Sequence, residues 1–306
     1  MTLLIGILAT AAMLGLGVFI YLEVKDLPQI RRQYDTICDR YYANCRVNIT
    51  VDTELKQPIY LFIEIDPISQ TIFPLKDSFS IDQLTDSLKD KITDEVTDQD
   101  LVADDCKFAL LNQDMSDVID IEAAGLNPMQ VAYPCGLMTK YFPSDDFYKI
   151  EMIKDKEGNI QNTSFEIKSE GLIPETWKSN VEFKNAEAAG RRWMDVETER
   201  FKIWMKRSSM YAPSKLWGVI ENDLQPGEYY VHIRISYDVS PFNGKKFFVL
   251  NGNTKNFSTR NMFIYIFPTL LVLPLTFFNI LLCITMKRYN DSQKKNGKSG
   301  DDENDA

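Results

Sequence analysis

Two long apolar stretches, one near each end, constrain this 306-residue chain more than any other feature. The stretches Thr2–Leu22 and Met262–Met286 contain no Asp, Glu, Lys or Arg. A helix rises about 1.5 Å per residue, so about 20 apolar residues cross a hydrocarbon core about 30 Å thick. The second stretch contains two prolines, which membrane helices tolerate. We predict transmembrane helices over residues 1–22 and 262–286.

The first stretch has an alternative interpretation, a signal peptide that is removed from the mature chain. It lacks the basic residues that open a signal peptide, and it is longer than the usual apolar region of about 7–15 residues. The sequence Ala9-Thr10-Ala11 resembles a cleavage site, but apolar residues continue beyond it. We therefore predict a retained anchor. A mature chain that begins near Glu23 would instead be a single-span, receptor-like protein.

The charges that flank the second stretch predict the orientation of the chain in a membrane. Lys287 and Arg288 follow it directly, and three more lysines lie in the tail. Because such clusters mark the cytosolic side, we expect residues 287–306 to form a cytosolic tail, whose polar composition predicts disorder. Two spans then place both termini in the cytosol and residues 23–261 in the lumen or outside the cell. Arg31 and Arg32 argue weakly for the opposite orientation, but a long loop translocates largely regardless of its charge.

The cysteines divide between the predicted membrane and the large loop. Cys283 lies within the second predicted span, where we expect a free, buried thiol. The loop contains the other four, and an even number in an oxidising compartment predicts two disulfides. Three connectivities exist, of which the simplest joins nearest neighbours. That pairing is Cys38 with Cys45 and Cys106 with Cys135. Their spacings are not those of a zinc site.

Three sequences in the loop match the acceptor motif for N-linked glycosylation. They begin at Asn48, Asn162 and Asn256. About two such motifs are expected by chance in a chain of this composition, so the motifs agree with a luminal loop without establishing it.

Strand signals outnumber helix signals within the loop. Runs of β-branched and aromatic residues, separated by Gly and Pro, are typical of short antiparallel strands. The runs are Arg46–Val51, Ile59–Ile65, Phe147–Ile153, Phe201–Met205, Glu228–Tyr237 and Lys245–Leu250. The segments Ile81–Ile92 and Asn185–Glu199 are predicted helices. We therefore expect a mainly-β domain, an antiparallel sandwich with helical insertions.

The residues that could perform chemistry are few. The tail is electrically balanced, so the formal charge of −10 belongs to the loop, and an acidic chain is a poor partner for nucleic acid. His232 is the single histidine and alternates within a predicted strand, which favours a structural role. The acidic pairs Asp104-Asp105 and Asp145-Asp146 are interpreted as solvated charges in polar loops. With no nucleotide-binding, hydrolase or metalloprotease motif, we predict no catalytic residue, metal or cofactor.

The run Trp204–Arg207 has two interpretations. Aromatic and basic residues side by side are typical of a binding patch, but a strand edge that leads into a turn explains them equally well.

Several further motifs are spread along most of the loop. They are Pro58-Ile59-Tyr60, Ser80-Ile81-Asp82-Gln83-Leu84, Pro134-Cys135-Gly136, Ser144-Asp145-Asp146-Phe147, Phe201 with Trp204, Met205 and Arg207, Pro213, Lys215-Leu216-Trp217-Gly218, Leu224 through Gly227 with Tyr229, Phe242 with Gly244 and Lys245, and Asn261. Their order resembles the cell-division-control-protein-50 family, also called ligand-effect modulators. The chain departs from that family after Glu64, where Ile65–Gln70 replaces an Asn-Phe-Tyr-Gln-Asn signature.

The resemblance implies a function without a reaction in this chain. Members of the family are accessory β-subunits of type IV P-type ATPases, the phospholipid flippases. It implies a heterodimer with the ATPase catalytic subunit, contact with membrane lipids, and a role in the exit of that subunit from the endoplasmic reticulum and in its activity. The expected location is an endoplasmic-reticulum, Golgi, endosomal or plasma membrane. The luminal domain would cover the short external loops of the partner, and its acidity would complement basic loops there.

A ligand-gated channel subunit is the alternative from another class, because some channels also have two spans and a large external domain. A channel needs polar, pore-facing residues along a span. Asn279 and Thr285 are polar side chains within the second stretch, which is thin support for a pore.

Overall fold

The computed structural model describes most of the large loop and part of the C-terminal end of the chain. The described residues are 8, 11–12, 15, 29–38, 44–173, 182–185, 192–209, 211–252, 273 and 275–292. The chain divides into two units, Pro28–Lys255 and a second that comprises Met1–Leu27 with Asn256–Ala306. The folded part that positions the family motifs lies in Pro28–Lys255.

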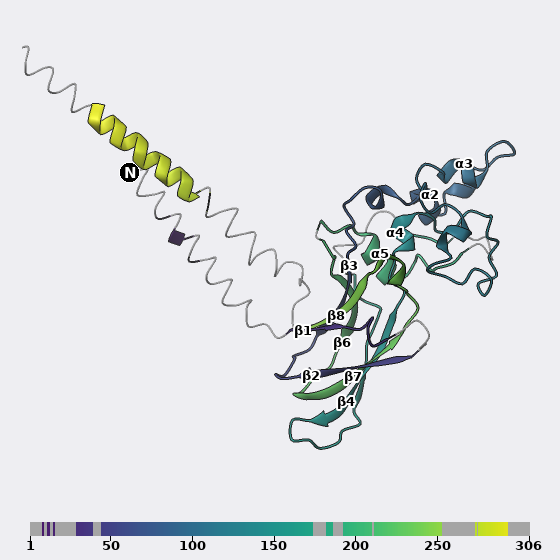
Figure 1. Cartoon of the computed structure of the whole chain (residues 1–306), viewed down its shortest axis with the longest axis horizontal. Coiled ribbons are helices and arrows are strands. Elements are labelled where there is room, and N and C mark those ends of the chain that lie inside the picture. Colours follow the sequence, from purple (N-terminus) through teal and green to yellow (C-terminus); the bar gives the residue numbers. More distant parts are fainter. Residues whose placement is uncertain are drawn as a thin grey trace, which may run out of the picture. The chain divides into compact units, whose positions relative to one another are not determined.

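Two antiparallel sheets of four strands form the larger part of Pro28–Lys255 (Figure 1). The first sheet has the order β1-β8-β3-β6, with β1 Gln29–Gln33, β8 Lys245–Gly252, β3 Ile59–Asp66 and β6 Lys215–Ile220. The second has the order β2-β7-β4-β5, with β2 Cys45–Val51, β7 Gly227–Arg234, β4 Asp146–Asp155 and β5 Ser164–Glu166. The predicted mainly-β antiparallel fold is confirmed.

The alternation of apolar and polar residues explains why the sheets pack face to face. Strand β2 buries every second residue, and its buried residues lie opposite Ile233, Val231 and Tyr229 of β7. These side chains share one core with alternate residues of β3, such as Leu61, and with Phe248 of β8. Because side chains on a strand point alternately to its two faces, this pattern fixes which face lies inside.

Short helices form a second region, the helical lobe, which comprises residues 67–144 and 192–209. Its helices gather at one end of the strands (Figure 1). They are η1 Leu75–Asp77, α2 Ile81–Leu84, η2 Leu88–Asp90, α3 Asp98–Val102, η3 Asn112–Met115, α4 Leu137–Lys140 and α5 Glu199–Met205. A further 3-10 turn, η5 Ser240–Phe242, precedes β8. The lobe has its own small core, which includes Leu88, Val102, Met115 and the Cys106–Cys135 disulfide.

Five of the six predicted strands are present, but the prediction for Phe201–Met205 is wrong. These residues belong to helix α5, because Thr198 caps the helix by accepting a hydrogen bond from the Phe201 amide and because Phe201 and Trp204, three positions apart, are both buried. The predicted helix Asn185–Glu199 is also wrong in its described part, since residues 192–198 are not helical and α5 begins only at Glu199.

The predicted helix Ile81–Ile92 is interrupted. Asp86 has a φ of 55°, a left-handed conformation that ends helix α2 before the short turn η2 begins. Strands β1, β5 and β6 lack a signal in our sequence analysis, because β1 and β5 are short and polar and β6 contains a lysine and a glycine.

The predicted spans 1–22 and 262–286 lie largely outside the described residues. Residues 275–292 are helical. Among the described residues, no helix combines the length and the apolar character needed to cross a membrane. Cys283 is a free thiol, but it is exposed on this helix, which corrects our expectation of a buried one; in the described helix, most side chains around it are exposed as well. The tail predicted over 287–306 is described only to residue 292.

Candidate functional site

A buried carboxylate joins both sheets of the sandwich to the segment that leaves the lobe and begins β4. Asp145 is fully buried just before β4 and accepts hydrogen bonds from side chains and backbone amides of three other segments. The donors are Tyr34 Oη at 2.9 Å, Lys246 Nζ at 2.7 Å, Ser236 N at 2.9 Å and Tyr237 N at 2.9 Å. The Asp145 carbonyl in turn accepts from Trp217 Nε1 at 2.9 Å. We call these residues the Asp145 junction.

The junction corrects the interpretation of Asp145-Asp146 as solvated charge in a loop. Asp145 and Lys246 form an ion pair from which water is excluded, and such a pair persists only where further donors satisfy the carboxylate. Burial, and then the charge of Asp145, raise the pKa of Tyr34 well above its ordinary value, so its hydroxyl remains a donor. Asp146 is partly exposed and pairs with Arg200 at 2.8 Å and Arg234 at 3.1 Å.

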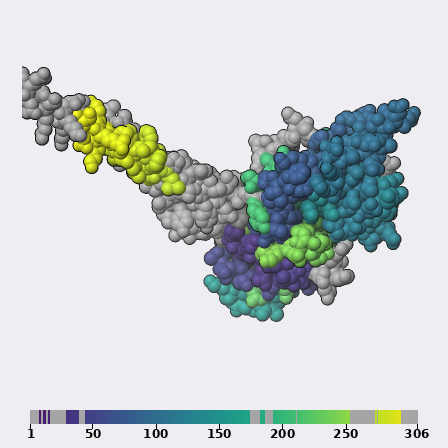
Figure 2. All heavy atoms as spheres, turned by 45° about the horizontal axis from the view of Figure 1, so that its top comes forward, coloured from purple at the N-terminus to yellow at the C-terminus, as the bar shows by residue number. Residues whose placement is uncertain are grey.

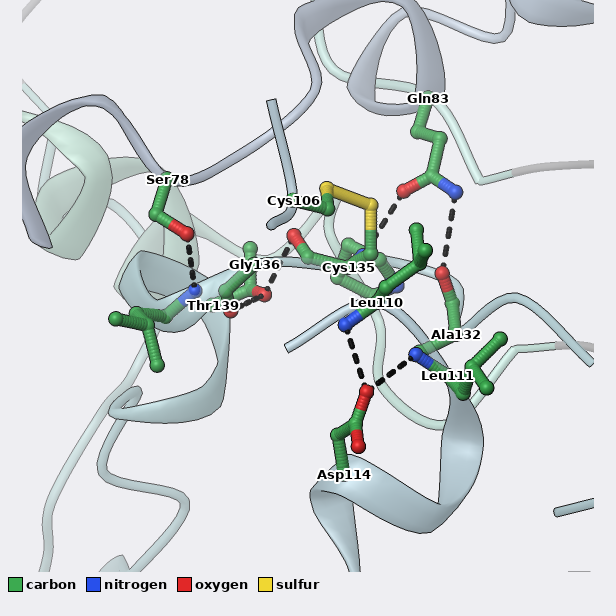
Figure 3. The surroundings of a disulfide bond; sticks show 12 residues. Ser78, Gln83, Cys106, Leu110, Leu111, Asp114, Ala132, Cys135, Gly136 and Thr139 are labelled. Carbon is green, nitrogen blue, oxygen red and sulfur yellow. Dashed lines mark hydrogen bonds between the residues drawn. A yellow bond between two sulfur atoms is a disulfide. The ribbon is translucent and has the colours of Figure 1, made fainter. Parts of the chain in front are cut away.

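A disulfide organises the lobe, and a buried amide ties helix α2 to it (Figure 3). The side chain of Gln83 accepts a hydrogen bond from the Cys135 amide at 2.9 Å and donates one to the Ala132 carbonyl at 3.1 Å. One side chain thus satisfies two buried backbone groups that belong to no strand or helix. Asp114 supports the same region by accepting from the amides of Leu110 and Leu111 at 3.0 and 2.8 Å.

The glycine after Cys135 allows a close approach of two backbones. Gly136 has a φ of 100°, and a Cβ there would lie 2.2 Å from the Ser78 carbonyl oxygen. This close approach allows Ser78 to accept two hydrogen bonds from the start of α4. Its Oγ accepts from the Leu137 amide at 2.9 Å, and its carbonyl accepts from the Met138 amide at 3.0 Å. Figure 3 shows Ser78 and Gly136 on neighbouring segments. Only glycine fits this position without displacement of the chain.

Helix α5 places the Trp204 motif inside the lobe. The Trp204 side chain is buried, and its Nε1 donates to the Met138 carbonyl at 2.7 Å, so Trp204–Arg207 is neither an aromatic-basic patch nor a strand edge. Met205 packs against the same core, whereas Arg207 is exposed and donates to the Lys76 carbonyl at 3.3 Å.

Lys215, at the start of β6, is a buried cation without a nearby carboxylate among the contacts that the structure gives it. Its ammonium donates to the carbonyls of Ile203, at 3.4 Å, and Lys206 at the C-terminal end of α5. Burial, and to a smaller extent the charge of the neighbouring Lys206, lower the pKa of Lys215 to about 7. The side chain closes the end of helix α5 where carbonyls lack partners within the helix.

The remaining motif residues lie in or beside the strands, where they shape the sandwich. Three of these residues are glycines that have no room for a side chain. A Cβ added to Gly218 would lie 2.5 Å from the Ile167 side chain. A Cβ added to Gly227 would lie 2.4 Å from the Lys154 carbonyl, and one added to Gly244 would lie 2.4 Å from the Phe242 ring. Pro58 directly precedes strand β3 and Tyr60 is its second residue, while Pro213 lies before β6 and Leu216 within it. The Tyr229 hydroxyl donates to the Gln225 carbonyl at 2.8 Å.

The sequons, His232 and the second acidic pair are also placed by the structure. Asn48 on β2 and Asn162 before β5 are exposed, and Asn256 lies outside the described residues. His232 is buried on β7 with its Nε2 2.8 Å from Glu151 Oε2, and burial lowers its pKa. Asp104 and Asp105 are exposed, in agreement with solvated charges. In the part of the chain that the structure describes, no three His, Cys, Asp or Glu side chains are grouped to hold a metal ion.

Sequence reasoning missed the Asp145 junction, although one signal was available. Lys246 alternates with Phe248 and Leu250 along β8, so a period of two places its side chain on the inner face. A buried anion is one way to stabilise a lysine that faces a core, and Asp145 supplies it for Lys246. The arrangement joins segments of both sheets, and the Tyr237 side chain extends it to the lobe by packing with Met138 and Trp204.

The sequence profile of the LEM3 (ligand-effect modulator 3) family / CDC50 family matches residues 23–291. The chain belongs to the CDC50 family. ALA-interacting subunit 3 of Arabidopsis thaliana is 22% identical over 277 residues, which cover 80% of this chain and 68% of that protein. A crystal structure of a protein from Sulfurospirillum deleyianum aligns with 74% of this chain and 98% of its own at 10% identity, but its TM-score of 0.29 is too low to indicate a shared fold. The CDC50 match spans the sandwich, the lobe and the helix 275–292.

Proposed function

We propose that this chain is the non-catalytic accessory subunit of a type IV P-type ATPase that moves phospholipid between membrane leaflets. The observation that carries the proposal is the CDC50 family match over residues 23–291. The name of the plant relative, an ALA-interacting subunit, agrees with a role as a subunit of another protein. ATP hydrolysis and its phosphorylated aspartate belong to the partner, and the part assigned to this chain is binding.

The proposal includes the membrane topology. Residues 1–22 and 262–286 span the membrane and pack against the membrane domain of the ATPase, with both termini in the cytosol. Residues 23–261 then face the lumen or the exterior and cover the short external loops of the ATPase. Sequencing the N-terminus of the mature protein tests this topology, because a start near Glu23 would leave a single span.

The partnership is tested by capture of the full chain from detergent-solubilised membranes of its native cells. We expect a P-type ATPase, identified by its peptides, in a one-to-one complex. Removal of this chain should retain that ATPase in the endoplasmic reticulum and abolish ATP-dependent uptake of a fluorescent phospholipid. Recovery of homotrimers alone would contradict the proposal and favour a channel subunit.

A further inference from the structure

The net charge of the chain is concentrated in one segment of the helical lobe. Residues 82–122, here the acidic segment, contain 13 Asp and Glu and 3 Lys. Their formal charge of −10 equals that of the whole chain, so all other residues together are electrically balanced. The elements η2, α3 and η3 of this segment surround one small core, which brings these charges to the surface of a single lobe. Figure 2 shows the blue part of the chain gathered in one lobe.

The same lobe carries most of the exposed apolar side chains of the domain. Nine large apolar side chains are exposed among the described residues of Pro28–Lys255, and six of them lie between residues 72 and 129. They are Ile72, Phe73, Ile81, Ile92, Phe108 and Met129. Phe73 is 75% exposed and packs edge-to-face on Phe108, with 6.2 Å between the ring centroids. Solvent-exposed aromatic pairs of this kind are typical anchors of protein interfaces.

Acidic side chains flank the aromatic pair. Asp104 and Asp105 lie three to four residues before Phe108 and are exposed. Partial burial, and then the charges of Asp82 and Asp104, raise the pKa of Asp105. The Lys107 ammonium also lies over the Phe108 ring, 6.0 Å from its centroid. With two carboxylates and one ammonium beside Phe108, the surface combines an apolar centre with a rim of net negative charge, which attracts cations and repels anions.

We propose that the acidic segment and the Phe73–Phe108 pair together form the surface that docks a Lys/Arg-rich, partly apolar segment of the ATPase subunit. This inference rests on the proposed function for the identity of the partner. Charge complementarity selects the occupant: the anionic headgroups of a membrane surface would be repelled, whereas basic side chains satisfy the rim and apolar ones cover the rings. Both described sequons lie in the second sheet, on β2 and beside β5, and leave this surface unobstructed.

Charge neutralisation tests the rim of the surface. The variant Asp94→Gln/Glu95→Gln/Asp104→Gln/Asp105→Gln removes four exposed charges from the acidic segment. The matched control Glu157→Gln/Glu166→Gln/Glu170→Gln/Glu228→Gln removes four exposed charges beyond the lobe. Captured as the full chain, the first variant should recover about tenfold less ATPase than the control, and the difference should shrink in high salt. Equal recovery by the two variants would overturn the inference.

Photo-crosslinking tests the apolar centre of the surface by the formation of a covalent adduct, so this test does not require a variant that binds less well. p-Benzoylphenylalanine replaces Phe73 in the full chain, and in the control it replaces Ile160, which is 77% exposed in the β4–β5 turn. We expect an adduct with a Lys/Arg-rich peptide of the ATPase from position 73 and no ATPase adduct from position 160. Adducts with lipid or with a second copy of this chain, or no adduct from position 73, would overturn the inference. If the wild-type chain captures no P-type ATPase, the proposed function itself fails.

Discussion

The sandwich and the helical lobe are built on different physical principles, although one chain forms both. The sandwich is held by the period-two burial of apolar side chains, as in β2, where every second residue enters a core that both sheets share. The lobe has short helices and a small core, and it depends on specific contacts such as the Cys106–Cys135 disulfide and the two hydrogen bonds of Gln83. A region stabilised by the burial of many apolar residues, such as the sandwich, tolerates the loss of one contact better than a region stabilised by a few specific contacts, such as the lobe.

The largest expected change in stability follows from loss of the Asp145–Lys246 ion pair in the Asp145 junction. Asp145→Ala leaves Lys246 charged and buried without its partner, so the free energy of unfolding should fall by about 3–5 kcal/mol. Thermal melting of the full chain in detergent measures it. Because Tyr237 of the junction packs with Met138 and Trp204 of the lobe, amide hydrogen exchange should accelerate in both regions. The exposed control Asp90→Ala should change the free energy by less than about 0.5 kcal/mol.

A double variant sharpens that result. Asp145→Ala combined with Lys246→Met removes both charges and should be more stable than Asp145→Ala alone, because no unpaired charge remains buried. If the double variant is the less stable of the two, an unpaired lysine is not the source of the loss.

The second prediction compares the two disulfides. Cys106 and Cys135 are 29 residues apart, whereas Cys38 and Cys45 are 7 apart. In the chain-entropy account, Cys106→Ser/Cys135→Ser should lower the free energy of unfolding by about 3–4 kcal/mol, and Cys38→Ser/Cys45→Ser by about 2 kcal/mol. Limited proteolysis should cut the lobe first in the former variant and spare the strands. If the protease cuts both variants at the same sites, the lobe does not depend on its disulfide more than the sandwich does.

The third prediction concerns a single polar side chain in each region. Gln83→Ala leaves the Cys135 amide and the Ala132 carbonyl without their partner, and should lower the free energy of opening of the lobe by about 2 kcal/mol. Hydrogen exchange of the amides between residues 83 and 135 measures it. The control Gln225→Ala removes an exposed contact with Glu54 at 2.6 Å and should have an effect within about 0.5 kcal/mol. Faster exchange throughout the strands of the first variant would count against a locally stabilised lobe.

The smallest effect is a pH dependence at the boundary of the two regions. The pKa of Lys215 is about 7 in the folded chain and near its ordinary value of 10.5 when unfolded. Between these values the unfolded chain binds the extra proton, so stability should rise with pH by at most about 1.4 kcal/mol per unit. Denaturation at several pH values from about 7 to 9 should show this rise in the wild type and a flatter profile in Lys215→Met. Identical slopes would show that Lys215 titrates normally.

The sequence predicts the sandwich better than the lobe for a physical reason. Alternation along β2 indicates which residues face inward, and runs of β-branched and aromatic residues predict β3, β4, β7 and β8; the structure confirms these strands. Helix α5 shows the opposite case: its buried Phe201, Ile203 and Trp204 fit a strand period as well as a helical one, and the Thr198 cap decides between them. The nearest-neighbour disulfide pairing agrees with the structure.

The candidate site was predictable only in part. The family motifs identify Gly136 and Trp204, but their roles depend on Ser78 and Met138, which lie about 60 residues away in sequence. Asp145 resembles many exposed acidic residues in sequence, and its burial follows from four donors contributed by distant segments. Such long-range contacts leave no local pattern for a sequence to display.

Strands β1 and β8, the first and last of the domain, are neighbours, and Gln29 lies opposite Asn251. The chain therefore enters and leaves the domain at the same end of one antiparallel pair. A force that drew the two end segments apart would load the hydrogen bonds between these strands one after another, beginning at Gln29, instead of all together. Such a force would therefore separate β1 from β8 stepwise, starting at the end of the pair where the chain enters and leaves the domain.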